Sequence, residues 1–225
     1  MTEGKRLFVG VQVSVATANA LARCAEQLSR RARDAKLDIK WVAPASYHVT
    51  LKFLGWTQTD AVSAVHDRVE AALVGAQGFR FRTSRLGAFP SLDKASVLWA
   101  GIEDPRPLTE LAERVERAAI ELGYKAEAKP FHPHVTIARL RETRAIREVV
   151  LPMSEQMFSE SRVDGVTLYE SETKSSGSVH KEISRISFKT AETEGRSTFR
   201  RQTGALELGD ETEQTDDGWP RSGGQ

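Results

Sequence analysis

Two histidines occur in matching surroundings, and histidine is the residue whose unperturbed pKa lies nearest to neutral pH. The two motifs read His48-Val49-Thr50-Leu51 and His134-Val135-Thr136-Ile137. They are 86 residues apart, and the chain has only 5 histidines in all. A chance repetition of the same four-residue pattern is improbable, so we interpret the motifs as the two copies of an internal repeat.

Both motifs lie in segments with strong β-formers, and alternate side chains of a strand project to the same face. His48 and Thr50 therefore share one face, while the two aliphatic residues between and after them point into a core. The same alternation places His134 and Thr136 together. We expect the two strands to offer their imidazole and hydroxyl groups to one shared site.

Such a pair of histidines suits paired proton transfer. One neutral imidazole removes a proton from an attacking oxygen, and the other, protonated, delivers a proton to the leaving oxygen. The hydroxyls of Thr50 and Thr136 can donate hydrogen bonds to the non-bridging oxygens of a phosphate. The sequence therefore predicts a phosphoesterase with His48 and His134 as its acid/base pair, without deciding which of them is the base.

A metal site is the main rival to this interpretation. Two histidines are few for catalytic zinc, which generally has three protein ligands, although an Asp or Glu could supply the third. The sequence contains no His-Glu-x-x-His pattern, no cysteine pair, no Gly-x-Ser-x-Gly elbow and no Gly-rich phosphate loop. We therefore expect a site without metal or cofactor, and we do not expect a serine hydrolase.

The order of elements favours an α+β fold with mainly antiparallel sheets, because strands that follow one another closely in sequence tend to pair. The patterns predict strands over residues 5–14, 39–42, 47–54, 79–86, 96–102, 131–140, 162–172 and 178–190. They predict helices over 17–36, 59–74, 105–122 and 143–157, the last interrupted near Pro152. The single cysteine, Cys24, falls on the first helix and is expected to be a small core residue.

Charge divides the chain into two parts. Residues 191–225 contain eight acidic residues and four arginines, a charge of −4, which leaves +5 on 1–190 because the whole chain carries +1. We expect 1–190 to form the domain and 191–225 to be a disordered acidic tail. A mildly basic domain suits an anionic substrate. No apolar run approaches a membrane span, and one cysteine fits a reducing cytoplasm, so we expect a cytoplasmic monomer.

The motifs and their flanks resemble the 2H phosphoesterase superfamily, and within it the RNA 2′,3′-cyclic phosphodiesterases of the LigT/ThpR type, once called 2′-5′ RNA ligases. The resemblance covers about residues 5–190. The segments that carry it are Arg6-Leu7-Phe8-Val9-Gly10-Val11, Trp41-Val42, Tyr47 to Gly55, Val97-Leu98-Trp99-Ala100-Gly101 and Phe131 to Arg139.

The resemblance implies a bilobal, pseudo-symmetric fold with two mainly antiparallel sheets, flanked by helices, around a central cleft. It implies metal-independent hydrolysis of an RNA 2′,3′-cyclic phosphate end to a 2′-phosphate, with reverse 2′-5′ ligation as a weaker side activity. Carried over to this sequence, His48 and His134 are the acid/base residues, and Thr50 and Thr136 bind the phosphate.

Three further positions are candidates for substrate binding. Arg139 matches an arginine that the family uses in its active site, but strict alternation puts it opposite to His134, so a bulge is required there. Lys52 shares the face of His48 by alternation and either attracts phosphate or is a solvated lysine, while Phe53 is expected in the core. His180 stands where the family often has tyrosine, and it either alters substrate preference and pH dependence or is a plain strand residue.

Two other functions compete with this one. The first is a nucleotide- or RNA-binding module that keeps the site but has lost turnover. The second keeps the chemistry and changes the substrate to a small cyclic nucleotide or to ADP-ribose 1″,2″-cyclic phosphate. Rates on short RNA and on mononucleotide cyclic phosphates would separate them.

Overall fold

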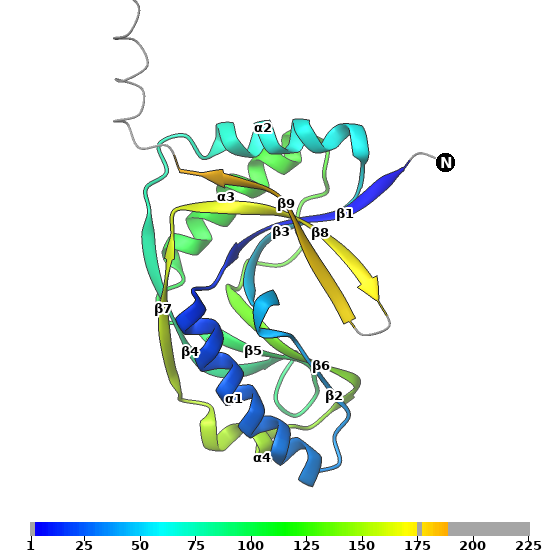
Figure 1. Cartoon of the computed structure of the whole chain (residues 1–225), viewed down its shortest axis with the longest axis vertical. Helices are drawn as coiled ribbons and strands as arrows, with labels where there is room; N and C mark the ends of the chain where they lie inside the picture. The colour runs from blue at the N-terminus through cyan, green and yellow to red at the C-terminus, as the bar shows by residue number, and fades with distance from the viewer. Residues whose placement is uncertain (1–2, 175–176, 189–225) are drawn as a thin grey trace, which may run out of the picture. The chain divides into compact units, whose positions relative to one another are not determined.

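The structure is a computed structural model that describes residues 3–174 and 177–188 (Figure 1). These residues belong to one compact unit, Met1–Thr190. The predicted acidic tail, 191–225, lies outside the described residues. In the part of the chain that is described, no helix has both the length and the apolar character needed to cross a membrane.

Several strands follow one another without an intervening α-helix, namely β2-β3, β4-β5 and β7-β8-β9, as expected of an α+β fold. The strands are β1 (Gly4–Gln12), β2 (Ile39–Trp41), β3 (His48–Gln58), β4 (Phe79–Phe89), β5 (Ala95–Ile102), β6 (His134–Arg144), β7 (Met157–Val163), β8 (Gly165–Lys174) and β9 (Gly177–Ser187). The helices are α1 (Val15–Asp34), α2 (Val62–Ala72), α3 (Arg106–Glu121) and the short α4 (Arg147–Val150).

The strands of the described segments form one curled sheet, so the prediction of two sheets is wrong. The order is β7-β4-β5-β6-β3-β1-β8-β9, with β2 paired to β6, and the strand pairs are antiparallel. The two halves, β7-β4-β5-β6 and β3-β1-β8-β9, join because β3 and β6 pair at Val49 and Val135. The two repeat motifs therefore lie at the seam of a single sheet.

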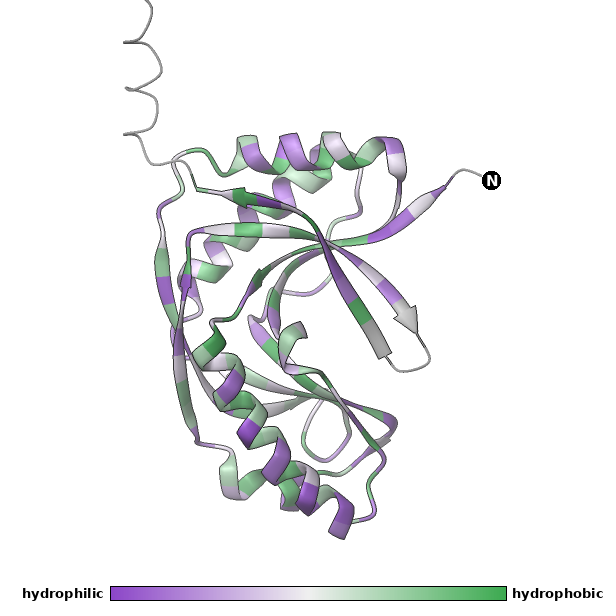
Figure 2. Cartoon of the chain, viewed as in Figure 1, coloured by the Kyte–Doolittle hydropathy of each residue, from purple (hydrophilic) through white to green (hydrophobic). Residues whose placement is uncertain are grey.

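Each of the two longest helices packs against one half of the sheet, while the strand before it in the chain belongs to the other half. Helix α1 follows β1 but contacts β7 and β2, whereas α3 follows β5 but contacts β3 and α2 (Figure 1). The exchange ties the two halves together over one continuous core. Apolar and polar residues alternate along α1 at helical spacing, so one face of this helix can be buried against the core (Figure 2).

Helix α1 illustrates how the local sequence sets these elements. It begins after Ser14, whose hydroxyl accepts a hydrogen bond from the backbone N–H of Thr17 at 3.1 Å, as an N-cap residue does. Its buried face includes Leu21, Cys24 and Leu28. Cys24 is thus the core residue that the sequence predicted, and burial raises the pKa of its thiol to about 11.

The helix predicted over 143–157, with an interruption near Pro152, is present only in part. Strand β6 continues to Arg144, α4 holds only four residues, and a 3₁₀ turn with Pro152 leads into β7 at Met157. Proline lacks the N–H that a continuing helix needs, and the following residues gain strand partners on β4 instead. The strand predicted over 162–172 is in fact the end of β7 and most of β8, which meet at Asp164.

Candidate active site

The two histidine motifs lie side by side on neighbouring strands. Val49 of β3 and Val135 of β6 are register partners in an antiparallel ladder, and both side chains are fully buried. The next positions in this register set His48 against Thr136, and Thr50 against His134. The structure therefore brings together the four motif residues that the sequence singled out.

Both motifs have a β-bulge at their fourth residue. Partners along β1 and β3 run Val9 to Lys52 and then Gly10 to Thr50, which leaves Leu51 without a partner. Partners along β5 and β6 run Leu98 to Ala138 and then Trp99 to Thr136, which leaves Ile137 without one. The repeat thus extends from the sequence to the irregularities of the backbone.

The bulge on β6 turns Arg139 to the face of His134. The sequence required such a bulge for Arg139 to join the site, and the register shift supplies it. Arg139 is exposed, and its positive charge lowers the pKa of His48, His134 and His180. Its guanidinium therefore lies close enough to act on all three imidazoles.

The bulge on β3 overturns the expected direction of Lys52. Lys52 points away from His48 and is 2% exposed, because the unpaired Leu51 shifts the alternation by one residue. Its ammonium donates to the carbonyl oxygen of Lys125 at 2.8 Å and pairs with Glu116 of α3 at 2.8 Å. A phosphate-binding role for Lys52 is therefore not supported, and the expected direction of its side chain was wrong.

Phe53 is displaced by the same bulge. It was expected in the core, but it is 58% exposed and lies on the face of His48, where its ring contacts Phe8 at a centroid distance of 5.9 Å. Within the repeat, Phe53 occupies the position that Arg139 occupies in the second motif. One strand thus presents an aromatic ring where the other presents a cation.

Backbone carbonyls fix which nitrogen of each histidine faces the site. Nδ1 of His48 donates to the carbonyl oxygen of Ser46 at 2.8 Å, and Nδ1 of His134 donates to that of His132 at 2.7 Å. A carbonyl can only accept, so Nδ1 carries the proton in both neutral rings. Nε2 is then the nitrogen available for proton transfer, and that of His48 accepts from the hydroxyl of Thr50 at 3.0 Å.

Burial keeps both imidazoles neutral near pH 7. Burial, against the opposing hydrogen bond to Ser46 and with the added charges of His180, His134 and Arg139, lowers the pKa of His48 to about 4. Burial also lowers the pKa of His134, helped by His132 and Arg139. The charge of His134 is one of the smaller causes that lower the pKa of His48, after burial and the charge of His180.

Aromatic rings supply this burial on both sides of the site. Phe8 stacks on His48 at 4.8 Å, and Phe89 meets His134 edge-on at 5.0 Å. Trp99 lies opposite Thr136 in the ladder, and a Cβ on Gly87 would collide with its indole. Of these rings, sequence reasoning placed Phe8 and Trp99 only as supporting parts of the resemblance, and it missed Phe89.

His180 approaches the site from the edge strand β9. Its ring stands edge-on to His48 at a centroid distance of 4.8 Å and to Phe8 at 5.0 Å. Two strands, β1 and β8, separate β9 from β3 in the sheet, so this contact requires the strong curl of that half. Nδ1 of His180 is buried and has no hydrogen-bond partner among the described residues, and burial with the charge of Arg139 lowers the pKa of the ring.

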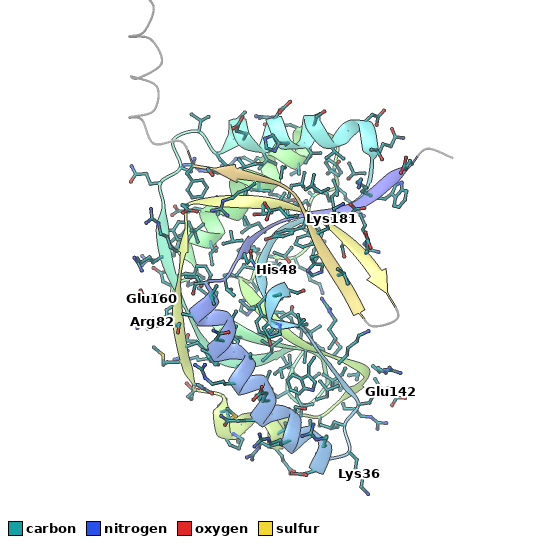
Figure 3. All side chains as sticks on the ribbon, in the orientation of Figure 1. Lys36, His48, Arg82, Glu142, Glu160 and Lys181 are labelled. Carbon is teal, nitrogen blue, oxygen red and sulfur yellow. The ribbon has the colours of Figure 1, made fainter. Side chains whose placement is uncertain are left out.

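The remaining candidates lie around this centre. His132 has its ring 6.3 Å from that of His134, and its carbonyl oxygen accepts the hydrogen bond from Nδ1 of His134. Figure 3 labels His48 close to the middle of the unit, and the ion pair of Arg82 and Glu160 at the β4–β7 edge.

Among the described residues, no three His, Cys, Asp or Glu side chains form a group that could hold a metal ion.

Comparisons with known proteins show the family of the chain. The sequence profile described as the 2′-5′ RNA ligase superfamily matches residues 14–175. A protein of Aquifex aeolicus named RNA 2′,3′-cyclic phosphodiesterase is 31% identical over 180 residues, which cover 78% of this chain and 93% of the relative. A relative of the same name from Archaeoglobus fulgidus is 28% identical and covers 79% of this chain and 97% of its own.

Solved structures share the fold. A crystal structure of a Thermus thermophilus protein superposes with a TM-score of 0.68 at 27% identity and covers 81% of this chain and 97% of its own. The crystal structure of Escherichia coli LigT complexed with 3′-AMP gives a TM-score of 0.61 at 23% identity, with 84% of this chain and all of the other covered.

Proposed function

The chain belongs to the 2′-5′ RNA ligase superfamily, and on that premise we propose that it hydrolyses the 2′,3′-cyclic phosphate at an RNA end to a 2′-phosphate. The observation that carries the proposal is the pairing of Val49 with Val135, which sets two imidazole and hydroxyl pairs against each other. A phosphate group between them would meet a base, an acid and two hydroxyl donors at once.

The proposed reaction needs one proton removed and one delivered. Water attacks phosphorus while Nε2 of His48 takes its proton, the bond from phosphorus to O3′ breaks, and Nε2 of His134 gives its proton to O3′. Solvent exchange then restores both rings, so the overall reaction consumes one water. The same groups acting in reverse would form a 2′-5′ linkage as a minor activity.

The assignment of His48 as the base follows from electrostatics. A base has to be neutral when substrate arrives, and His48 has a pKa of about 4. Burial lowers the pKa of both rings, but the larger effect falls on His48, which is the more deeply enclosed of the two. An anionic substrate beside His134 would raise the pKa of that ring and so favour the protonated acid.

The substrate-binding groups are proposed to be Thr50, Thr136, Arg139 and His180. The hydroxyl of Thr50 donates to Nε2 of His48 in the free protein, so substrate binding would turn it towards a phosphate oxygen. Arg139 supplies a charge that already acts on all three imidazoles. His180 offers a buried Nδ1 without a partner among the described residues, which a hydroxyl or phosphate oxygen of the substrate would satisfy.

The test is product analysis with a short RNA that ends in a 2′,3′-cyclic phosphate. We expect conversion to the 2′-phosphate, unaffected by EDTA, and loss of turnover in His48→Asn and His134→Asn. His66→Asn is the matched control, because His66 lies on α2 and bonds Ser184 outside the site. A 3′-phosphate product, or activity lost in EDTA and restored by zinc, would contradict the proposed mechanism.

The competing functions are outcomes of the same experiment. Binding of a 2′-phosphorylated RNA without turnover of any cyclic phosphate would indicate a binding module. Turnover confined to a mononucleotide or to ADP-ribose 1″,2″-cyclic phosphate would indicate another substrate.

We also propose that residues 1–190 form the catalytic domain of a cytoplasmic monomer. A chain with a single cysteine, Cys24, cannot form an internal disulfide, which fits a reducing compartment. Light scattering on the full chain gives the oligomeric state.

A further inference from the structure

Strand β3 carries a second bulge beyond the one that displaces Lys52. Its partners on β1 run Leu7 to Gly55 and then Phe8 to Phe53, which leaves Leu54 unpaired. The two bulges keep a single row of side chains on the face of His48. That row reads His48, Thr50, Phe53 and Trp56, while the residues between are glycine or are buried on the other face.

The outer half of this row is aromatic and exposed. Phe53 is 58% exposed and Trp56 is 68% exposed, although burial of such rings is normally favourable. The row is continuous with the catalytic centre, since Phe8 stacks on His48 at 4.8 Å and contacts Phe53 at 5.9 Å. Exposed aromatic rings that extend from a site indicate a surface that ligand covers.

The position of Trp56 is set by the strand beside it. Its indole lies against the backbone at Gly4, where a Cβ would come within 2.5 Å of Cε2 of the ring. Gly4 therefore allows the large ring to approach β1 closely. The ring is supported from one side and open to solvent over most of its surface.

A cation stands next to the exposed indole. Arg6 is the register partner of Trp56 in the antiparallel ladder, so both side chains project from the same face. Arg6 is exposed, whereas its neighbour Lys5 is paired with Glu170 at 2.6 Å. An aromatic ring beside a guanidinium is the combination that binds a base together with its phosphate.

We propose that Phe53, Trp56 and Arg6 form a stacking platform for the nucleotides that precede the cyclic phosphate in single-stranded RNA. The inference rests on the proposed function and specifies its substrate as an oligonucleotide. The bases stack on Phe53 and then on Trp56, and Arg6 neutralises a backbone phosphate beside them. A mononucleotide occupies only the histidine end of the row and leaves Trp56 uncovered.

The class of ligand that binds the platform follows from the charge of Arg6 and from the continuity of the row with the histidines. The row begins at the proposed phosphoryl-transfer site and ends at Trp56 beside the cation Arg6, so its ligand carries phosphates along its length. Stacking is tolerant of base identity, because every base has a π-face. The platform therefore selects for chain length and not for sequence.

The test compares adenosine 2′,3′-cyclic phosphate with a hexa-adenylate that ends in the same cyclic phosphate. We expect wild-type kcat/KM to favour the hexamer. Trp56→Ala loses about fivefold or more on the hexamer, mainly through KM, and keeps its rate on the mononucleotide. Trp56→Phe retains most of the preference, and Leu151→Ala, which alters a 55% exposed side chain of the α4 region, changes neither rate.

A second measurement separates failure of the platform from failure of the proposed function. The affinity for a hexa-adenylate 2′-phosphate is measured by fluorescence anisotropy in wild type and Trp56→Ala, and the salt dependence is measured in Arg6→Ala. Equal affinity and an equal hexamer preference in Trp56→Ala overturn the platform, whether or not the wild type turns over. If the wild type hydrolyses neither probe, the proposed function fails, and the anisotropy result alone decides the platform.

Discussion

Val49 and Val135 are cross-strand partners, and each stands between the histidine and the threonine of its own motif. The pair has two consequences. It joins the halves of the curled sheet, and it sets each histidine against the threonine of the other motif. Because both valines are fully buried, the spacing of the two imidazoles is fixed by packed core and not by a loop.

Replacing either catalytic histidine should nearly abolish turnover. We expect His48→Asn and His134→Asn each to lower kcat by about 10²- to 10⁴-fold, the usual contribution of a positioned acid or base. The double variant should lose little more than the worse single one, because the pair acts as a unit. Single-turnover assays on the hexamer measure the effect, with thermal unfolding to check the fold. Additive losses would contradict a paired mechanism.

The rate should depend on pH in a direction set by burial. His48 has to be neutral to act as base, and its pKa is about 4 in the free protein, so kcat/KM should rise with pH through about 4. It should fall at higher pH as His134 loses its proton. Measuring kcat/KM against pH for wild type and for His66→Asn locates the acidic and the basic limb of the profile. An acidic limb near the ordinary histidine value of about 6.5 would contradict the buried environment of His48.

Folding stability should fall on the acidic side for the same reason. Between the folded pKa of His48, about 4, and its unfolded value, 6.5, the unfolded chain binds a proton that the folded chain does not. Stability is therefore lost as pH drops from 6.5 towards 4, by about 3 kcal/mol at about 1.36 kcal/mol for each pH unit. Urea unfolding at pH 7 and at about pH 4.5 measures this loss. His48→Asn should reduce the difference, and an unchanged difference would assign it to other groups.

His180 should set part of the acidic limb. Its positive charge at low pH lowers the pKa of His48, so His180→Tyr should raise that pKa and move the acidic limb to higher pH. Tyrosine keeps an aromatic edge and a polar atom at this position, which preserves the contact with Phe8. The pH profile of kcat/KM tests the shift. A profile that stays in place would show that His180 is a plain strand residue.

The relative placement of the four motif residues could be predicted from the sequence, because a repeat carries its own evidence. Two equal motifs imply equal local structure, and strand alternation then fixes His48 with Thr50 and His134 with Thr136. The bulge before Arg139 could also be inferred, since a functional arginine on the wrong face demands one. The first motif contains no such misplaced functional residue, and Lys52 and Phe53 were consequently assigned to each other's faces.

The remaining errors come from long-range pairing. Whether there are one or two sheets depends on the contact of Val49 with Val135, and no local pattern reports that contact. His180 reaches His48 only because the sheet curls, which depends on the sum of strand twists and bulges. The helix predicted over 143–157 is shorter than expected because β7 finds its partner on β4, far earlier in the chain.

Lys52 should matter for stability and for the loop before His134. Its ammonium is buried and joins β3 to Glu116 of α3 and to the carbonyl of Lys125, in the segment that leads to β6. Lys52→Ala removes the partner of a carboxylate that is 24% exposed, so we expect a loss of about 3 kcal/mol, at the low end for breaking a buried pair. Lys129→Ala, an exposed lysine of the same loop, is the control and should change stability little. Urea unfolding gives both values.

Because His134 bonds the carbonyl of His132 in this loop, Lys52→Ala should also shift the basic limb of the pH profile. A stability loss without that shift would confine Lys52 to the core.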